Sequence, residues 1–156
     1  MSELIKKIES MISLEENNAS GLSSSVEGLS NVLVQEILRS IAHDSRKHAG
    51  FYTAIISLLK SESKALTNQE YNSLESIIKK HIEVESTMME EVKKLLESEL
   101  DSRIKHIMTD IYEDEVKHHA LMKHLLKAVI RKEAILEEDV WDMVWSDVPG
   151  HGAPIG

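Results

Sequence analysis

The chain has 156 residues, which is enough for one domain with a sizeable hydrophobic core. Its formal net charge is −9 and it has no cysteine, which argues against a nucleic-acid-binding surface and excludes disulfides and iron–sulfur centres. No apolar run reaches the roughly 18 residues of a membrane span, and the N-terminus lacks the apolar core of a signal peptide, so we expect a cytoplasmic location.

The residues before Trp145 are nearly free of helix breakers. Both prolines and three of the six glycines follow this tryptophan. Long stretches rich in Leu, Ile, Glu and Lys favour helices, and no stretch alternates for long enough to indicate a sheet. The sequence therefore predicts an all-α fold.

The first predicted helix runs from about Ser2 toward Gly28, and its apolar stripe contains one acidic residue, Glu15. The stripe comprises Ile5, Ile8, Ile12, Glu15, Ala19 and Leu22. A carboxylate in a core position is costly unless it is paired or binds a metal. Glu15 is therefore a candidate metal ligand.

The second predicted helix follows a turn at 28–31, in which Ser30 or Asn31 supplies the N-cap, and runs to about Lys60. Its predicted inner line is also interrupted by polar residues, with Asp44 beside them. The line comprises Val34, Leu38, Ile41, Ser45, His48, Tyr52, Ile55 and Leu59.

The third predicted helix begins after a short polar link, where Thr67 or Asn68 is the N-cap and Glu70 is placed to complete a capping box. We expect His81 and Glu85 to occupy core positions. The predicted inner line comprises Tyr71, Leu74, Ile78, His81, Glu85, Met88, Val92 and Leu95.

The fourth predicted helix runs from a turn at 98–101 to about Lys132 and carries a Glu-x-x-His motif, Glu115 and His118. Residues three apart lie on one helical face, about 5–6 Å apart at Cβ, so this carboxylate and imidazole can reach one metal ion. The motif lies on the line of Ile104, Met108, Ile111, Met122, Leu125 and Val129. Four other histidines, His43, His106, His119 and His124, are expected at the surface.

Residues 41–48 and 111–118 share Ile, Asp, Lys and His at an offset of 70 positions, and the same offset relates Glu15 to Glu85. The chain is therefore interpreted as two similar helical hairpins. Given a rise of about 1.5 Å per residue, the polar core residues of both hairpins lie near one level.

With this pattern, residues from about Ser2 to Lys132 resemble the ferritin-like di-iron carboxylate superfamily, and within it a rubrerythrin-like erythrin domain without the rubredoxin module. The resemblance implies a four-helix bundle over residues 1–133, followed by a short acidic helix at about 137–145 and a loose tail within residues 134–156. It implies iron as cofactor, with two ions, or else manganese or zinc. The implied metal ligands are Glu15, His48, Glu85, Glu115 and His118.

The departure from the family pattern is Ser45, which stands where the second bridging Glu is expected. Three alternatives follow: Asp44 rotates in, water or a substrate oxygen fills the gap, or one metal position is weakened. We favour a retained but asymmetric site. His81 is a candidate substitute ligand or hydrogen-bond partner, although a hydrogen-bonded core histidine is the simpler interpretation.

The resemblance implies a non-haem di-iron oxidoreductase that acts on O2 or peroxide or oxidises Fe(II), with a separate electron donor. The alternative is a degenerate bundle that serves as a metal-binding or structural module without redox activity. Nothing in the sequence favours an iron-storage cage. The link between the second and third helices is too short to cross the bundle comfortably. We therefore expect a homodimer, with hairpin exchange between chains as a hypothesis.

Overall fold

The computed structural model describes residues 2–62, 64–132, 142, 144–145 and 148. These residues contain four long helices and no strand, so the all-α prediction is confirmed. The helices are α1 (Ser2–Ser25), α2 (Val32–Leu59), α3 (Asn68–Leu96) and α4 (Ser102–Arg131).

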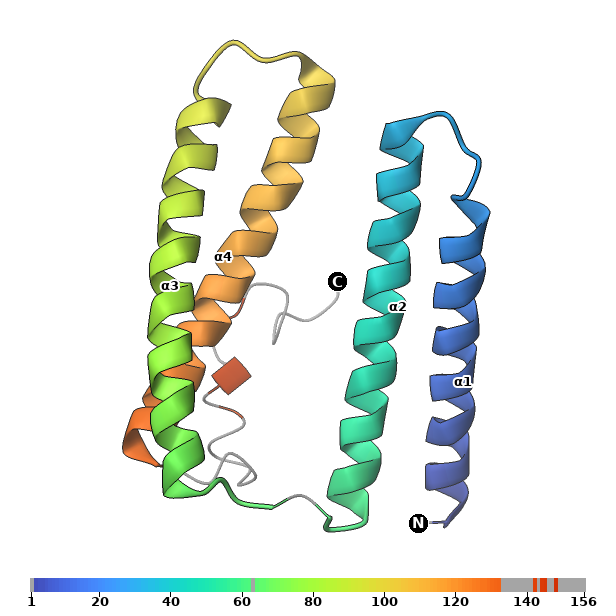
Figure 1. Ribbon diagram of the computed structural model, residues 1–156, viewed down its shortest axis with the longest axis vertical. Coiled ribbons are helices and arrows are strands. Elements are labelled where there is room, and N and C mark those ends of the chain that lie inside the picture. Colours follow the sequence, from blue (N-terminus) through green and yellow to red (C-terminus); the bar gives the residue numbers. More distant parts are fainter. Residues whose placement is uncertain (1, 63, 133–141, 143, 146–147, 149–156) are drawn as a thin grey trace. The chain divides into compact units, whose positions relative to one another are not determined.

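The helices pack in pairs, α1 with α2 and α3 with α4, within two compact units, Met1–Lys64 and Ala65–Gly156. Each pair is an antiparallel hairpin (Figure 1). We call α1 and α2 hairpin 1, and α3 and α4 hairpin 2. The two predicted hairpins are thus confirmed, and each is described by itself below.

The predicted caps are present at the start of α2 and α3. Asn31 Oδ1 accepts a hydrogen bond from the Val34 N–H at 3.1 Å. Thr67 and Glu70 form the reciprocal capping box expected from the sequence. Gly28, in the α1–α2 turn, has φ of 95°, a left-handed conformation that glycine adopts without strain.

The interior of hairpin 1 confirms the predicted stripe on α1, where Ile8 and Ala19 are buried. On α2 the seam with α1 consists of Ala42, Ser45 and Ala49, whereas Ile41 is 46% exposed in this hairpin. The prediction that Ile41 lies on the inner line of the whole bundle stays a prediction. The separation of packed helices depends on the side chains at the contact, so the small residues suit the seam better than isoleucine does.

The core of hairpin 2 is centred on Tyr71 and Ile78 of α3 and Val129 of α4. Partly buried apolar residues surround these three: Leu66, Leu74, Ile82, Met122, Leu125 and Leu126. This cluster lies toward the start of α3 and the end of α4, because the two helices are antiparallel.

The short acidic helix predicted at 137–145 and the predicted tail lie mostly outside the described residues. Of this segment, Val144 and Trp145 pack near Ala128 and Leu121 of α4. Within the described part of the chain, no helix has both the length and the apolarity that crossing a bilayer requires.

Candidate metal centre

Glu85 of α3 and Glu115 and His118 of α4 converge across the seam of hairpin 2. Each offers one ligand atom, and the three atoms lie within 4.8 Å of one another. The spacing of three residues on α4 puts Glu115 and His118 on one face, and the packing of α3 against α4 brings Glu85 within reach of them. The predicted Glu-x-x-His motif and the predicted ligand on α3, Glu85, therefore form one group.

The Glu85 carboxylate is the feature that most needs a partner. Its Oε2 atom is buried and makes no hydrogen bond among the described residues. A buried carboxylate oxygen that has lost its water without a replacement is costly, and a second carboxylate nearby increases the cost by repulsion. A divalent cation would relieve both costs. Two carboxylates and one imidazole form a donor set that suits iron, manganese or zinc.

In hairpin 1, the two predicted ligands contact each other. Oε1 of Glu15 lies 3.2 Å from Nδ1 of His48, and the two side chains are 24% and 50% exposed. Glu15 also lines a shallow pocket of about 370 Å³ with Asn18 and Tyr52. The prediction that these two residues join those of hairpin 2 in one centre concerns both units together and stays a prediction.

Ser45 is buried at the seam of hairpin 1, where it is 4% exposed. Its Oγ atom accepts a hydrogen bond of 2.9 Å from Nδ2 of Asn18 on α1. The neighbouring Asp44 is exposed and binds Lys47 at 2.5 Å, and this hydrogen bond holds the pKa of Asp44 below its ordinary value. In this conformation Asp44 does not take the place of the missing carboxylate.

His81 is exposed and lies outside the group of three ligand residues in hairpin 2. His81 therefore does not lie in the seam between α3 and α4, and the prediction that it occupies a core position of the whole bundle stays a prediction. Ile82 packs in the core instead, because the seam of α3 passes from Ile78 to position 82 and then to Glu85.

The expectation that His119 and His124 lie at the surface is wrong. Both are partly buried; Nδ1 of His124 lies 3.2 Å from the carbonyl oxygen of Val144, and Nδ1 of His119 is buried without a hydrogen-bond partner among the described residues. The repeat could have predicted the partial burial of His119, since the offset of 70 relates this residue to Ala49, which is buried in hairpin 1.

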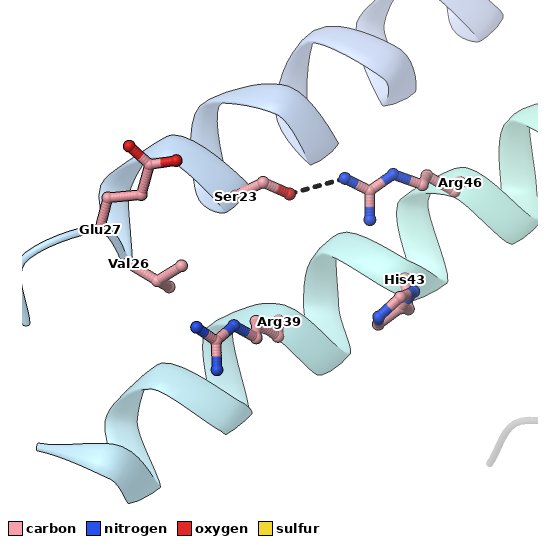
Figure 2. A pocket seen from close by; sticks show the side chains of 6 residues that line it. All are labelled: Ser23, Val26, Glu27, Arg39, His43 and Arg46. Carbon is pink, nitrogen blue, oxygen red and sulfur yellow. Dashed lines mark hydrogen bonds between the residues drawn. The ribbon is translucent and has the colours of Figure 1, made fainter.

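A second pocket, of about 290 Å³, lies in hairpin 1 near the end of α1 (Figure 2). Its lining comprises Ser23, Val26, Glu27, Arg39, His43 and Arg46. Arg46 donates a hydrogen bond of 2.6 Å to Ser23 Oγ, and Arg39 pairs with Glu36. The last turn of α1 has no basic residue of its own, so Arg46 brings a positive charge to the negative end of this helix. The arginine side chains that line this pocket are thus explained by their stabilising role in hairpin 1.

A comparison with models of protein families matches residues 12–126 to Rubrerythrin. This span covers most of the chain. The protein belongs to the rubrerythrin family. Comparisons with curated proteins and with solved structures found no match.

The rubrerythrin match includes every residue that the sequence singled out for metal binding. It begins before Glu15 and ends after His118, so it spans parts of both hairpins. Membership supports a di-iron, ferritin-like protein, and the group of Glu85, Glu115 and His118 is a carboxylate–histidine group of the kind that such a protein uses.

Proposed function

We propose that this rubrerythrin-family protein binds iron through carboxylates and histidines and acts as an oxidoreductase toward O2 or peroxide, or oxidises Fe(II). The observation that carries the proposal is the buried Oε2 atom of Glu85, which lies beside Glu115 and His118 and has no hydrogen-bond partner in the part of the chain that the structure describes. A polar group of this kind calls for an explanation in a folded protein, and a bound cation supplies one.

The roles of the residues follow from their chemistry. Glu85 and Glu115 supply anionic oxygen and are half-buried, while His118 supplies a nitrogen donor. We propose that Glu15 and His48 complete a retained but asymmetric centre, with Ser45 in place of a second bridging carboxylate. Bound iron supplies one-electron chemistry with O2 or peroxide. Since the sequence has no cysteine, the reducing equivalents come from a separate protein or from Fe(II) itself.

We further propose that the protein is a homodimer, with hairpin exchange as the form of assembly. Each hairpin has large apolar side chains in contact with solvent, such as Ile37 and Phe51 in hairpin 1 and Ile104 and Ile107 in hairpin 2. A second copy of the chain would cover such side chains. Native mass spectrometry is the test, and a monomeric mass at micromolar concentration would contradict the dimer.

The test of the function is metal analysis followed by stopped-flow oxidation. Protein purified from cells grown with iron is expected to contain iron, and the anaerobic Fe(II) form is expected to be oxidised faster by O2 or peroxide than free Fe(II) is. The Glu115→Gln variant should lose both properties. Purified protein that neither contains nor takes up metal would contradict the proposal.

A second candidate is a degenerate bundle that serves as a structural or interaction module. The hydrogen bond between Asn18 and Ser45 favours it, because this bond satisfies a buried polar position without any metal. In that case chelators would leave the melting temperature unchanged. A fall in melting temperature on removal of metal would exclude a metal-free module, and the stopped-flow oxidation would then distinguish a metal-binding module without redox activity.

A further inference from the structure

The two hairpins place different chemistry at equivalent positions. The offset of 70 residues relates Glu15 to Glu85 and His48 to His118, so these positions are preserved. The same offset relates Ser45 to Glu115 and Asn18 to Met88, so these positions differ. The two hairpins can therefore be compared with each other, because hairpin 2 has two carboxylates at the related positions and hairpin 1 has one.

In hairpin 2, the four related positions do not satisfy one another. Glu85 and Glu115 are both anionic acceptors, and Met88 offers only a weakly accepting thioether. Oε2 of Glu85 stays buried and unpartnered among the described residues. The group has two carboxylates and, among the described residues, no hydrogen bond to this oxygen, which is an arrangement that a divalent cation stabilises.

In hairpin 1, the same positions are paired with one another. Glu15 contacts His48 at 3.2 Å, and Asn18 donates to Ser45 at 2.9 Å. The second pair is neutral, and its amide and hydroxyl are a donor and an acceptor matched across the α1–α2 seam. Hairpin 1 thus needs no cation to satisfy its polar groups.

We propose that this division sets the metal stoichiometry: Glu85, Glu115 and His118 hold one ion tightly, and the Asn18–Ser45 pair prevents hairpin 1 from contributing an equal second position. The inference rests on the proposed metal binding and specifies where the ion binds first. Asn18 and Ser45 act as residues that determine stoichiometry, because a neutral pair replaces a carboxylate that a second ion would require. Any second ion that Glu15 and His48 help to bind is held more weakly.

The test is titration of the chelator-stripped, full-length protein with Co(II), followed by its visible absorption and by calorimetry. The wild type is expected to take up one tight equivalent per chain. Glu115→Gln and Glu85→Gln should each lower the affinity for this tightly bound Co(II) by at least about tenfold, because each removes a charged ligand. The matched variant at the equivalent position of hairpin 1 is Glu15→Gln. It should lower the affinity for the tightly bound Co(II) by less than about threefold, which is well below the effect of losing a ligand or the hydrogen-bond partner of a ligand.

The gain-of-binding variant is Asn18→Met combined with Ser45→Glu, which places in hairpin 1 the residues that hairpin 2 has at the related positions. It should raise the count to two tight equivalents. Far-ultraviolet circular dichroism of each metal-free variant verifies the helical fold, and the single change Ser45→Glu serves as the second variant should the double change not fold.

The outcomes separate the inference from the proposed function. Two equally tight equivalents in the wild type, or a loss in Glu15→Gln as large as that in Glu115→Gln, would overturn the inference while metal binding stands. No Co(II) uptake at all, with Fe(II) uptake also absent, would overturn both.

Discussion

The side-chain amide of Asn18 and the hydroxyl of Ser45 form a hydrogen bond of 2.9 Å between α1 and α2. Ser45 is almost fully buried, whereas Asn18 is exposed, so losing Asn18 removes this partner from the buried hydroxyl and losing Ser45 leaves the amide in reach of water. The bond occupies the position at which the rubrerythrin resemblance implies a carboxylate. Its contribution to stability is therefore a property of hairpin 1 that does not depend on metal.

A double-mutant cycle measures that contribution. Asn18→Ala and Ser45→Ala should each destabilise the metal-free protein, and the coupling free energy between them should be about 1 kcal/mol, the usual net value of a hydrogen bond. The measurement is urea unfolding in the presence of a chelator. Strict additivity of the two changes would show that the bond contributes nothing in solution.

The core of hairpin 2 gives a second prediction, with a matched control on the same helix. Ile78 is 3% exposed and Ile77 is 53% exposed. Ile78→Val should lower the free energy of unfolding by about 1 kcal/mol, because a buried methylene is lost and a small cavity is left. Ile77→Val removes the same atoms from a solvated position and should have an effect near zero. Equal effects in urea unfolding would contradict the assigned core.

The capping box at the start of α3 gives a third prediction. Thr67→Ala removes the side chain that accepts a hydrogen bond from the backbone of Glu70, and should lower the free energy of unfolding by about 1 kcal/mol. Ser76→Ala, at an exposed position inside the same helix, should be neutral or slightly stabilising because alanine is the better helix former. Chemical denaturation of both variants decides the point, and the prediction fails if the two changes have the same sign and size.

The same capping box predicts a pH dependence. Hydrogen bonds from Thr67 lower the pKa of Glu70 below its ordinary value of 4.5. A carboxyl whose pKa is lowered in the folded state stabilises that state above the unfolded pKa, and the stabilisation is lost as the pH falls through the folded pKa. The difference in unfolding free energy between wild type and Glu70→Gln should thus be larger at neutral pH than well below pH 4.5. Denaturant titrations at both pH values test this, and a difference that grows on acidification would contradict it.

The effect on the melting temperature of removing one carboxylate from hairpin 2 should have opposite signs in metal-free and in metal-loaded protein. In metal-free protein, Glu115→Gln relieves the repulsion with Glu85 and should raise the melting temperature or leave it unchanged. In metal-loaded protein, the same change removes a ligand and should lower the melting temperature, because an ion that binds only the folded state stabilises it. Thermal melts with chelator and with excess metal make the comparison. A variant that behaves identically in both would argue against Glu115 as a ligand.

Most of the fold and part of the candidate centre follow from the sequence. Long uninterrupted helical segments, a glycine in the first turn and the Thr67–Glu70 box fixed the number and order of helices. The i, i+3 spacing of Glu115 and His118 determined that they share a face, and the repeat placed Glu85 opposite them. These features are local or repeated, which is why a sequence reveals them.

The sequence did not show which of two adjacent helical faces forms the seam of each hairpin. On α2, apolar residues occupy both position 41 and position 42, so two neighbouring stripes are possible. On α3, the stripe can continue from Ile78 to either His81 or Ile82. Which stripe forms the seam depends on how closely the partner helix approaches, and small side chains such as Ala42 decide that. Similarly, the pairing of Asn18 with Ser45 joins residues 27 positions apart, and no local pattern indicates it.

The most direct test of the central claim is a crystal structure of the Fe(II)-loaded protein with anomalous scattering measured at the iron edge. The account predicts an anomalous peak in contact with Glu85, Glu115 and His118. It also predicts that the Asn18–Ser45 hydrogen bond of hairpin 1 stays intact in the loaded protein. Fully loaded crystals without an iron peak at these three side chains would contradict the account.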